Sequence, residues 1–330
     1  MRTVPIVPTV PLLRRGIGAI VFTVSFPLFA QDFPAKPIRW IIPFGPGTIF
    51  ERAARIAVPE MSKTLGQPIV VETRPGAGAL IGTEYVAKQA PADGYTMLMG
   101  LTNLLTFKLF VKELRFDPMK DLVPVALLFD SQVFILANSK QPFSTFPEFI
   151  SYARANPGKL NYGTSGTQSY PELMFQAMQM RFGISLVQIV YKDGTTAAQA
   201  GLLADHVQLS IGGQAQTLGG ISTGNLKALT VSGDRRVASL PDVPAATEIG
   251  YPDLIPSWYS IHVAAATPKP IIDRLGRAAL GALQHPETRA LFEKNYFRII
   301  ALGPEQAARQ IAAEEEIYRG IARKAGIQPQ

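Results

Sequence analysis

The sequence contains no cysteine. This absence excludes disulfide bridges, thiolate metal sites, a cysteine nucleophile and a lipid-modified cysteine. Histidine is scarce, because only His206, His262 and His285 occur, and their separation does not match metal-ligand spacing. We therefore expect neither a metal nor another cofactor.

Long apolar runs are also lacking. Residues 16–29 are mostly apolar, but this run is shorter than the roughly 20 residues that a membrane-spanning helix needs. Three arginines precede the run, and Ala30-Gln31 follows it as a plausible cleavage point. The sequence thus predicts a signal peptide over residues 1–30, cleaved near Ala30, and a mature chain outside the cytoplasm without membrane insertion.

The composition is that of an ordinary globular protein, with 47% hydrophobic and 17% charged residues. The formal net charge is +7, and losing the three arginines of the predicted signal peptide lowers it to +4. This charge is too small and too dispersed for nucleic-acid binding, although it mildly favours anionic ligands. We expect a monomer without a nucleic-acid partner.

One stretch near the mature N-terminus has the pattern of a ligand-binding turn. Trp40–Ile42 predict a buried strand, Pro43–Gly47 a turn, and the apolar spacing after Thr48 a helix, which Pro59 should end or kink. Thr48 and Glu51 are spaced as a capping box. Free backbone N–H groups at such a helix start suit a ligand carboxylate. The alternative is an ordinary turn that binds no ligand.

Other glycine- and hydroxyl-bearing loops follow predicted strands. One edge ends at Thr102, a second loop precedes the helix that begins near Pro171, and a third opens the helix that ends near Ala204. The candidate ligand-binding residues are Phe44, Gly45, Gly47, Thr48, Phe50, Glu51, Thr102, Thr164, Ser165, Gly166, Thr167, Ser169, Tyr170, Gly194, Thr195 and Thr196.

Three motifs invite other interpretations that we set aside. The glycines of residues 76–82 resemble a dinucleotide fingerprint, but their last spacing is one residue too long. Ser165 lacks the surroundings of a nucleophile, so no enzyme activity is expected. The run Glu314–Glu316 reads as a solvated helix face and not as a metal site.

Repeated strand–helix units predict two doubly wound α/β lobes that share a ligand cleft. Residues 123–138 have the pattern of a long strand crossing between lobes, and helices are expected at 271–283 and 304–325. The predicted boundaries are 31–131 for the first part of lobe 1, 132–245 for lobe 2, and 246–330 for the return to lobe 1.

At this point the sequence also resembles a family, the Bug-type (TctC-like) periplasmic solute-binding proteins of tripartite tricarboxylate transporters. The resemblance covers the mature chain and is carried by several blocks: 65–68, 74–78, 91–95, 161–166, 190–192 and 239–244. It implies a bilobed, Venus-flytrap protein of the type II periplasmic-binding class. The family's pocket grips a small carboxylate through backbone N–H groups and loop hydroxyls.

The chain departs from the family pattern in the predicted pocket. Phe50 stands where threonine is usual, Glu51 replaces aspartate, and a frequent aspartate falls near Gly212. Phe50 and Tyr170 therefore predict a stacking wall for an aromatic or otherwise flat acid. The alternative is that Phe50 points into the core of its own lobe.

The predicted function is capture of a small carboxylate, aromatic or dicarboxylic, for a membrane permease of the tripartite tricarboxylate type. The alternative is a sensor that presents the carboxylate to a membrane signalling partner such as a sensor kinase. The resemblance fits both functions.

Overall fold

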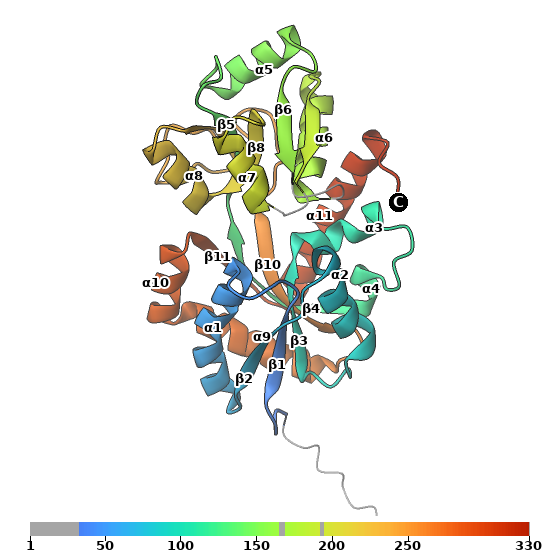
Figure 1. The fold of residues 1–330 in the computed structure, drawn as a ribbon. Coiled ribbons are helices and arrows are strands. Elements are labelled where there is room, and N and C mark those ends of the chain that lie inside the picture. The colour runs from blue at the N-terminus through green and yellow to red at the C-terminus, as the bar shows by residue number, and fades with distance from the viewer. Residues whose placement is uncertain (1–32, 165–168, 192–194, 330) are drawn as a thin grey trace, which may run out of the picture. The chain divides into compact units, whose positions relative to one another are not determined.

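The computed structural model describes residues 33–164, 169–191 and 195–329, and all of its elements lie in the unit formed by residues 34–330 (Figure 1). The predicted signal peptide, residues 1–30, lies outside the described residues. Two β-sheets organise the unit, as the α/β prediction requires.

The first sheet has six strands, in the order β11-β4-β10-β3-β1-β2. β1 pairs in parallel with β2 and β3, whereas β10 runs antiparallel to β3 and β4, and β11 antiparallel to β4. The bounds are β1 Ile38–Ile42, β2 Ile69–Thr73, β3 Thr96–Leu101, β4 Leu122–Ser131, β10 Ser257–Ala264 and β11 Phe297–Leu302.

The second sheet has five strands, in the order β7-β6-β8-β5-β9. β6 pairs in parallel with β7 and β8, and β5 lies antiparallel between β8 and β9. The bounds are β5 Val133–Asn138, β6 Asn161–Thr164, β7 Val187–Val190, β8 Leu209–Gly213 and β9 Leu226–Val231.

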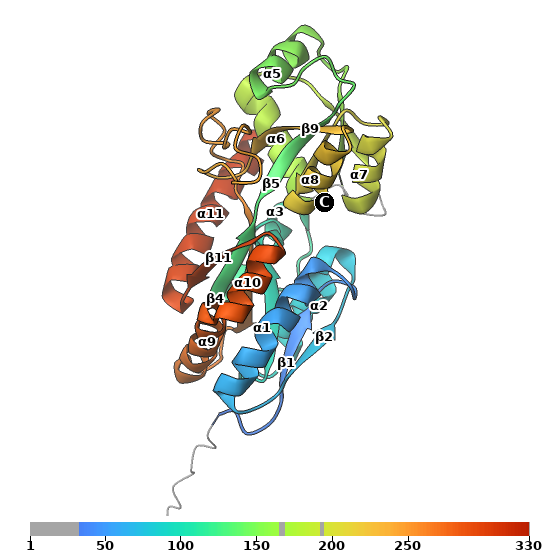
Figure 2. The ribbon, with the colours of Figure 1, turned by 90° about the vertical axis from the view of Figure 1, so that its left-hand side faces the viewer.

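Helices surround both sheets. Those associated with the first sheet are α1 Ile49–Leu65, α2 Leu80–Glu84, α3 Phe107–Phe110, α4 Pro118–Asp121, α9 Lys269–Gln284, α10 Pro286–Lys294 and α11 Pro304–Lys324, with short turns at Ala77–Ala79, Tyr85–Gln89 and Thr102–Leu105. Those of the second are α5 Phe146–Ala155, α6 Tyr170–Phe182, α7 Thr195–Leu203 and α8 Gln214–Ser222. α11 contacts both β4 and α6, so it reaches from the first sheet to the second (Figure 2).

The described chain crosses between the sheets twice, first between β4 and β5 and again over residues 232–256, between β9 and β10. The first crossing lies where the sequence predicts it. The expected strand over residues 123–138 is divided at Gln132 into β4 and β5, one in each sheet. Gln132 is buried, and its side-chain oxygen accepts a hydrogen bond from the Ser232 hydroxyl at 2.9 Å. The same hydroxyl oxygen accepts the Val133 N–H at 3.0 Å, which fixes the start of β5.

The helix after Thr48 does not end at Pro59. α1 continues through Pro59 to Leu65, because its buried face, which includes Ala57 and Met61, remains packed beyond the proline. The predicted C-terminal helices at 271–283 and 304–325 are confirmed as α9 and α11. The chain between them forms α10 and then β11, which the sequence did not predict and which completes the edge of the first sheet. No helix among the described residues is both long and apolar enough to cross a bilayer.

Candidate functional site

The turn after β1 has the form predicted from the sequence. β1 is almost fully buried, and its chain leaves the sheet through Pro43 and reverses at Gly47, where φ is +78°. Thr48 is the N-cap of α1, with an extended backbone. Its hydroxyl does not cap the helix, however, because it donates to the carbonyl of Gly45 at 3.1 Å.

Glu51 corrects the capping-box prediction. Its Oε2 accepts the N–H of Gly47 at 2.7 Å, and its Oε1 accepts from the Arg55 guanidinium at 2.6 and 2.9 Å. The hydrogen bond from Gly47, followed by that from Arg55, holds the pKa of the Glu51 carboxyl below its usual value. The N–H of Gly47 is thus occupied by the chain's own carboxylate, and its predicted role as a ligand contact stays a prediction.

Aromatic rings lie beside this turn. The ring of Phe50 is 4.4 Å from that of Phe44 and 5.5 Å from that of Tyr259, measured between centroids. Tyr259 in turn stacks on Phe129 of β4 at 4.6 Å. One side of the Phe50 ring therefore packs against the buried Tyr259, while the side chain as a whole stays half-exposed.

The glycine run of residues 76–82 serves packing. Gly76 and Gly78 have positive φ angles of 135° and 63°. A Cβ atom on Gly82 would lie 2.9 Å from the Cα atom of Pro43 and 2.7 Å from the carbonyl of Arg74. Glycine is required here because α2 lies directly against the turn that follows β1.

Thr102, at the end of β3, is buried in a polar contact with β10. Its hydroxyl oxygen accepts the backbone N–H of Trp258 at 3.0 Å and lies 3.4 Å from the hydroxyl of Ser257. Only 2% of Thr102 is exposed. The structure shows that Thr102 holds the start of β10. Its predicted role as a ligand contact stays a prediction.

Glu314 corrects the prediction that the Glu314–Glu316 run is a solvated face. Glu314 is 7% exposed, and its Oε2 accepts the indole N–H of Trp258 at 2.6 Å. Its Oε1 accepts from the side chain of Gln310 at 2.9 Å. Burial raises the pKa of the Glu314 carboxyl. No local sequence pattern indicates this contact, because the partner of Glu314 lies 56 residues away in the chain.

Tyr170 begins α6 in the second sheet's half of the molecule. Its hydroxyl donates to the carbonyl of Ile255 in the second crossing, and its ring packs edge-on against Tyr318 of α11 at 6.4 Å. The side chain is half-buried. The structure thus places Tyr170 against the crossing and α11.

The remaining candidates lie in the loops of the second sheet. Thr164 is buried, and its hydroxyl accepts from the side chain of Gln188 at 2.9 Å. Ser169 caps α6 by accepting the N–H of Glu172. Other candidates lie outside the described residues or have side chains that the structure does not describe: Ser165, Gly166, Thr167, Gly194, Thr195 and Thr196.

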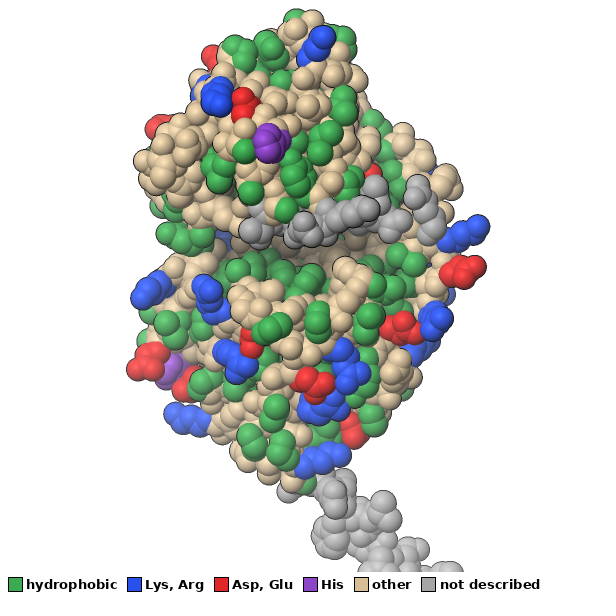
Figure 3. Space-filling model, in the orientation of Figure 1, with side chains coloured by type: hydrophobic (Ala, Val, Ile, Leu, Met, Phe, Trp, Pro, Cys, Tyr) green, Lys and Arg blue, Asp and Glu red, His purple; other side chains and the backbone are tan. Residues whose placement is uncertain are grey.

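The face in Figure 3 is hollowed between the elements of the two sheets, and hydrophobic side chains gather along the lower rim. A groove of about 420 Å³ also runs along α1 from the turn after β1. Its lining residues are Gly47, Thr48, Glu51, Arg52, Arg55, Ile56, Pro59 and Leu291.

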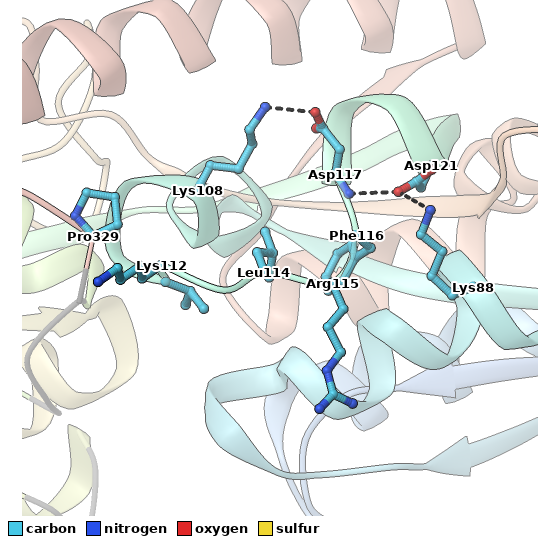
Figure 4. A pocket seen from close by; sticks show the side chains of 10 residues that line it. Lys88, Lys108, Lys112, Leu114, Arg115, Phe116, Asp117, Asp121 and Pro329 are labelled. Atoms are coloured by element: carbon cyan, nitrogen blue, oxygen red, sulfur yellow. Dashed lines mark hydrogen bonds and ion pairs between the residues drawn. The ribbon is translucent and has the colours of Figure 1, made fainter.

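A second depression, of about 440 Å³, lies near α3 and α4 and is rich in cations (Figure 4). Lys108 pairs with Asp117 at 2.8 Å and Lys88 with Asp121 at 2.7 Å. Arg115 points away from these pairs. The cations do not converge on one point, and none of the lining residues belongs to a predicted ligand loop.

The histidines and acidic residues behave as structural groups. His262 is 1% exposed and lies 3.0 Å from the hydroxyl of Ser260, and burial lowers its pKa to about 3. His206 is exposed. Among the described residues, no cluster of histidine, aspartate and glutamate has the arrangement of a metal site.

The chain forms two β-sheets that are flanked by helices, joined by two crossings and bordered by loops at the strand ends. This architecture is that of the two-lobed class of ligand-binding proteins. The family model for the tripartite tricarboxylate transporter family receptor matches residues 53–327. The chain therefore belongs to this receptor family, whose members are solute-binding proteins and not enzymes. The resemblance predicted from the sequence is confirmed.

Individual relatives match the chain over nearly its whole length. Protein BugT of Bordetella pertussis is 31% identical over 95% of this chain and 97% of its own. A Rhodopseudomonas palustris structure with adipate has a TM-score of 0.78 and 26% identity, covering 91% of this chain and 100% of that one. MatC of Rhodopseudomonas palustris with bound malate has a TM-score of 0.74 and 26% identity, covering 88% and 100%. The two-lobed fold predicted from the sequence is confirmed.

Proposed function

We propose that this protein captures a small carboxylate between its two lobes outside the cytoplasm and delivers it to a membrane permease of the tripartite tricarboxylate type. The observation that carries the proposal is membership of the receptor family, combined with relatives solved with adipate and malate. Both of those ligands are carboxylates, and the loops at the strand ends of this chain carry hydroxyl and backbone N–H groups.

The lobes follow from the distribution of strands. All strands of the first sheet lie within residues 38–131 and 257–302, and all strands of the second within 133–231. This supports lobe 1 at residues 31–131 and 246–330, and lobe 2 at 132–245. We further propose that residues 1–30 are a signal peptide cleaved near Ala30.

Capture proceeds by closure of the lobes over the ligand. The turn over residues 44–51 and the edge at Thr102 contribute from lobe 1, and residues 164–170 and 194–196 from lobe 2. A ligand stabilises the closed form only if it binds that form more tightly than the open one. Closure also removes water from the carboxylate, which strengthens its hydrogen bonds.

A thermal-shift screen of residues 31–330 against mono-, di- and tricarboxylates, aromatic acids included, tests the proposal. A ligand present at 100 times its dissociation constant stabilises the folded state by about 2.7 kcal/mol. We expect at least one carboxylate to raise the melting temperature. A response confined to amines or sugars would contradict the proposal.

Ser165→Val and Thr195→Val test the loops of lobe 2. Ser165→Val replaces a hydroxyl with a bulkier apolar group, and Thr195→Val replaces a hydroxyl with a methyl group of similar size. Both remove a hydrogen-bonding group, so we expect weaker binding at an unchanged melting temperature. Ser151→Val on α5 is the matched control, because the Ser151 hydroxyl only bonds its own helix at Pro147. Unchanged affinity in both loop variants would exclude these loops from the site.

A measurement of ligand uptake by cells distinguishes the transport function from the sensor function. Cells lacking the protein should lose uptake of the labelled carboxylate found in the screen. Unchanged uptake, together with loss of a transcriptional response to that carboxylate, would favour the sensor instead.

A further inference from the structure

A closed circuit of contacts joins the start of α6 to the second crossing. Tyr170 donates its hydroxyl to the carbonyl of Ile255, three residues before Trp258 along the chain. The ring of Tyr170 also packs against Tyr318 at 6.4 Å, with an angle of 67° between the ring planes. One side chain thus contacts both the crossing and α11.

The circuit closes at Trp258. Its indole N–H donates to Glu314 at 2.6 Å, and Glu314 lies four residues before Tyr318 on α11. Residues four apart share a face of a helix, so Glu314 and Tyr318 act from the same side of α11. Trp258 is 1% exposed, so its indole has little freedom to move independently.

The backbone of Trp258 extends the circuit to lobe 1. Its N–H donates to the hydroxyl of Thr102 at 3.0 Å, directly after β3. The same β10 strand carries Tyr259, on which Phe50 packs at 5.5 Å. Trp258 therefore connects the start of α6 to both predicted ligand edges of the first sheet.

One atom in this circuit is poorly satisfied. The hydroxyl of Tyr318 is buried and has no hydrogen-bond partner among the described residues. A buried unpaired hydroxyl is unfavourable, whereas the hydroxyl of the adjacent Tyr170 is paired. The two tyrosine hydroxyls at the contact between α6 and α11 therefore differ, because that of Tyr170 is paired and that of Tyr318 has no partner among the described residues.

We propose that Tyr170 is a positioning residue for ligand capture: it fixes the start of α6 to the second crossing and passes movement of α6 to Trp258. The movement travels through Ile255 along the chain, and through Tyr318 and Glu314 across α11. Ligand-driven movement rests on the proposed function, whereas the coupling of Tyr170 to Trp258 exists without a ligand.

Tryptophan fluorescence tests the proposal, because the chain has only Trp40 and Trp258. In a Trp40→Phe background, Trp258 is the single reporter. Tyr170→Phe keeps the ring and removes only the hydroxyl. We expect it to shift the emission of Trp258 without ligand and to weaken binding of the tightest carboxylate about tenfold, the equivalent of one hydrogen bond of about 1.4 kcal/mol.

The matched control is Tyr152→Phe on α5, whose ring packs on Phe143 away from the circuit. This variant should change neither emission nor affinity. Hydrogen exchange of the peptide covering residues 255–259 gives a second readout that does not depend on tryptophan, and it should rise in Tyr170→Phe. Wild-type exchange, emission and affinity in Tyr170→Phe would overturn the proposal.

The outcomes separate this inference from the proposed function. If adipate, hexanoate, benzoate and citrate all leave the Trp40→Phe protein unchanged, carboxylate capture is contradicted. An emission shift caused by Tyr170→Phe in that same protein would still support the coupling. If a carboxylate binds but Tyr170→Phe affects neither affinity nor emission, the coupling is overturned and the function stands.

Discussion

The backbone N–H of Gly47 donates to the carboxylate of Glu51 at 2.7 Å, so α1 begins with an anion supplied by its own chain. The same carboxylate is held by Arg55. An external carboxylate that approaches this turn must either displace Glu51 or bind beside a like charge, which is unfavourable. If the proposed site at this turn is right, the charge of Glu51 contributes to the choice of acid.

We predict that Glu51→Gln favours dicarboxylates. Adipate and hexanoate have the same chain length and differ by one carboxylate, so their affinity ratio isolates the second charge. Removing the charge of Glu51 should shift this ratio toward adipate by about tenfold. Isothermal titration calorimetry of both acids measures it.

Glu60→Gln on the same helix is the control, because the Glu60 carboxylate lies 3.9 Å from Lys63 and away from the turn. It should leave the ratio unchanged. An equal effect of the two variants would mean that long-range charge, and not the position of Glu51, sets the ratio.

Because Glu314 contacts Trp258 and Glu316 does not, we predict that alanine substitutions at these two glutamates differ strongly in their effect on stability. Glu314→Ala leaves the buried indole N–H of Trp258 unpaired and should cost about 1–3 kcal/mol. Glu316→Ala removes only exposed ion pairs and should change the free energy of unfolding by less than about 0.5 kcal/mol. Urea denaturation compares them, and similar values would contradict the burial of Glu314.

His262 predicts an acid-dependent loss of stability. Its pKa in the folded chain is about 3, below the usual 6.5, because burial disfavours the charged ring. As the pH falls below 6.5, the unfolded chain takes up a proton that the folded chain does not, so stability falls by up to about 1.4 kcal/mol per pH unit. His262→Gln should flatten this slope between about pH 6 and pH 4.

The exposed His206 provides the control for that experiment. His206→Gln should retain the slope of the wild-type protein. Urea denaturation at each pH gives both slopes, and equal slopes for the wild type and His262→Gln would exclude His262 as the cause.

We predict that substituting alanine for glycine has opposite effects on stability at Gly100 of β3 and Gly281 of α9. A Cβ atom on Gly100 of β3 would lie 2.3 Å from Nδ1 of His262 and 2.6 Å from the hydroxyl of Ser260, so Gly100→Ala should cost about 1–3 kcal/mol. Gly281 in α9 meets nothing within 4 Å. Gly281→Ala should stabilise by about 0.4–1 kcal/mol. Thermal unfolding of both variants checks the pair.

The sequence alone determined the features that depend only on residues close together in the chain. The buried run of β1, the turn that follows it and the start of α1 at Thr48 are all local patterns of apolar spacing, glycine and proline. The crossing near residues 123–138 was predictable because its long apolar pattern exceeds one ordinary strand. Repeated strand–helix units predicted two α/β lobes, and the resemblance to a known family implied the same two-lobed fold.

Only the tertiary structure decided which polar groups meet across the chain. Glu314 and Glu316 are indistinguishable in a run of glutamates, and only the packing of α11 against Trp258 of β10 buries the first and leaves the second exposed. Tyr170 contacts Ile255 and Tyr318 only because the folded chain brings these distant residues next to it. Helical spacing fixes the face on which a residue lies, but the partner of that face depends on contacts between segments distant in sequence.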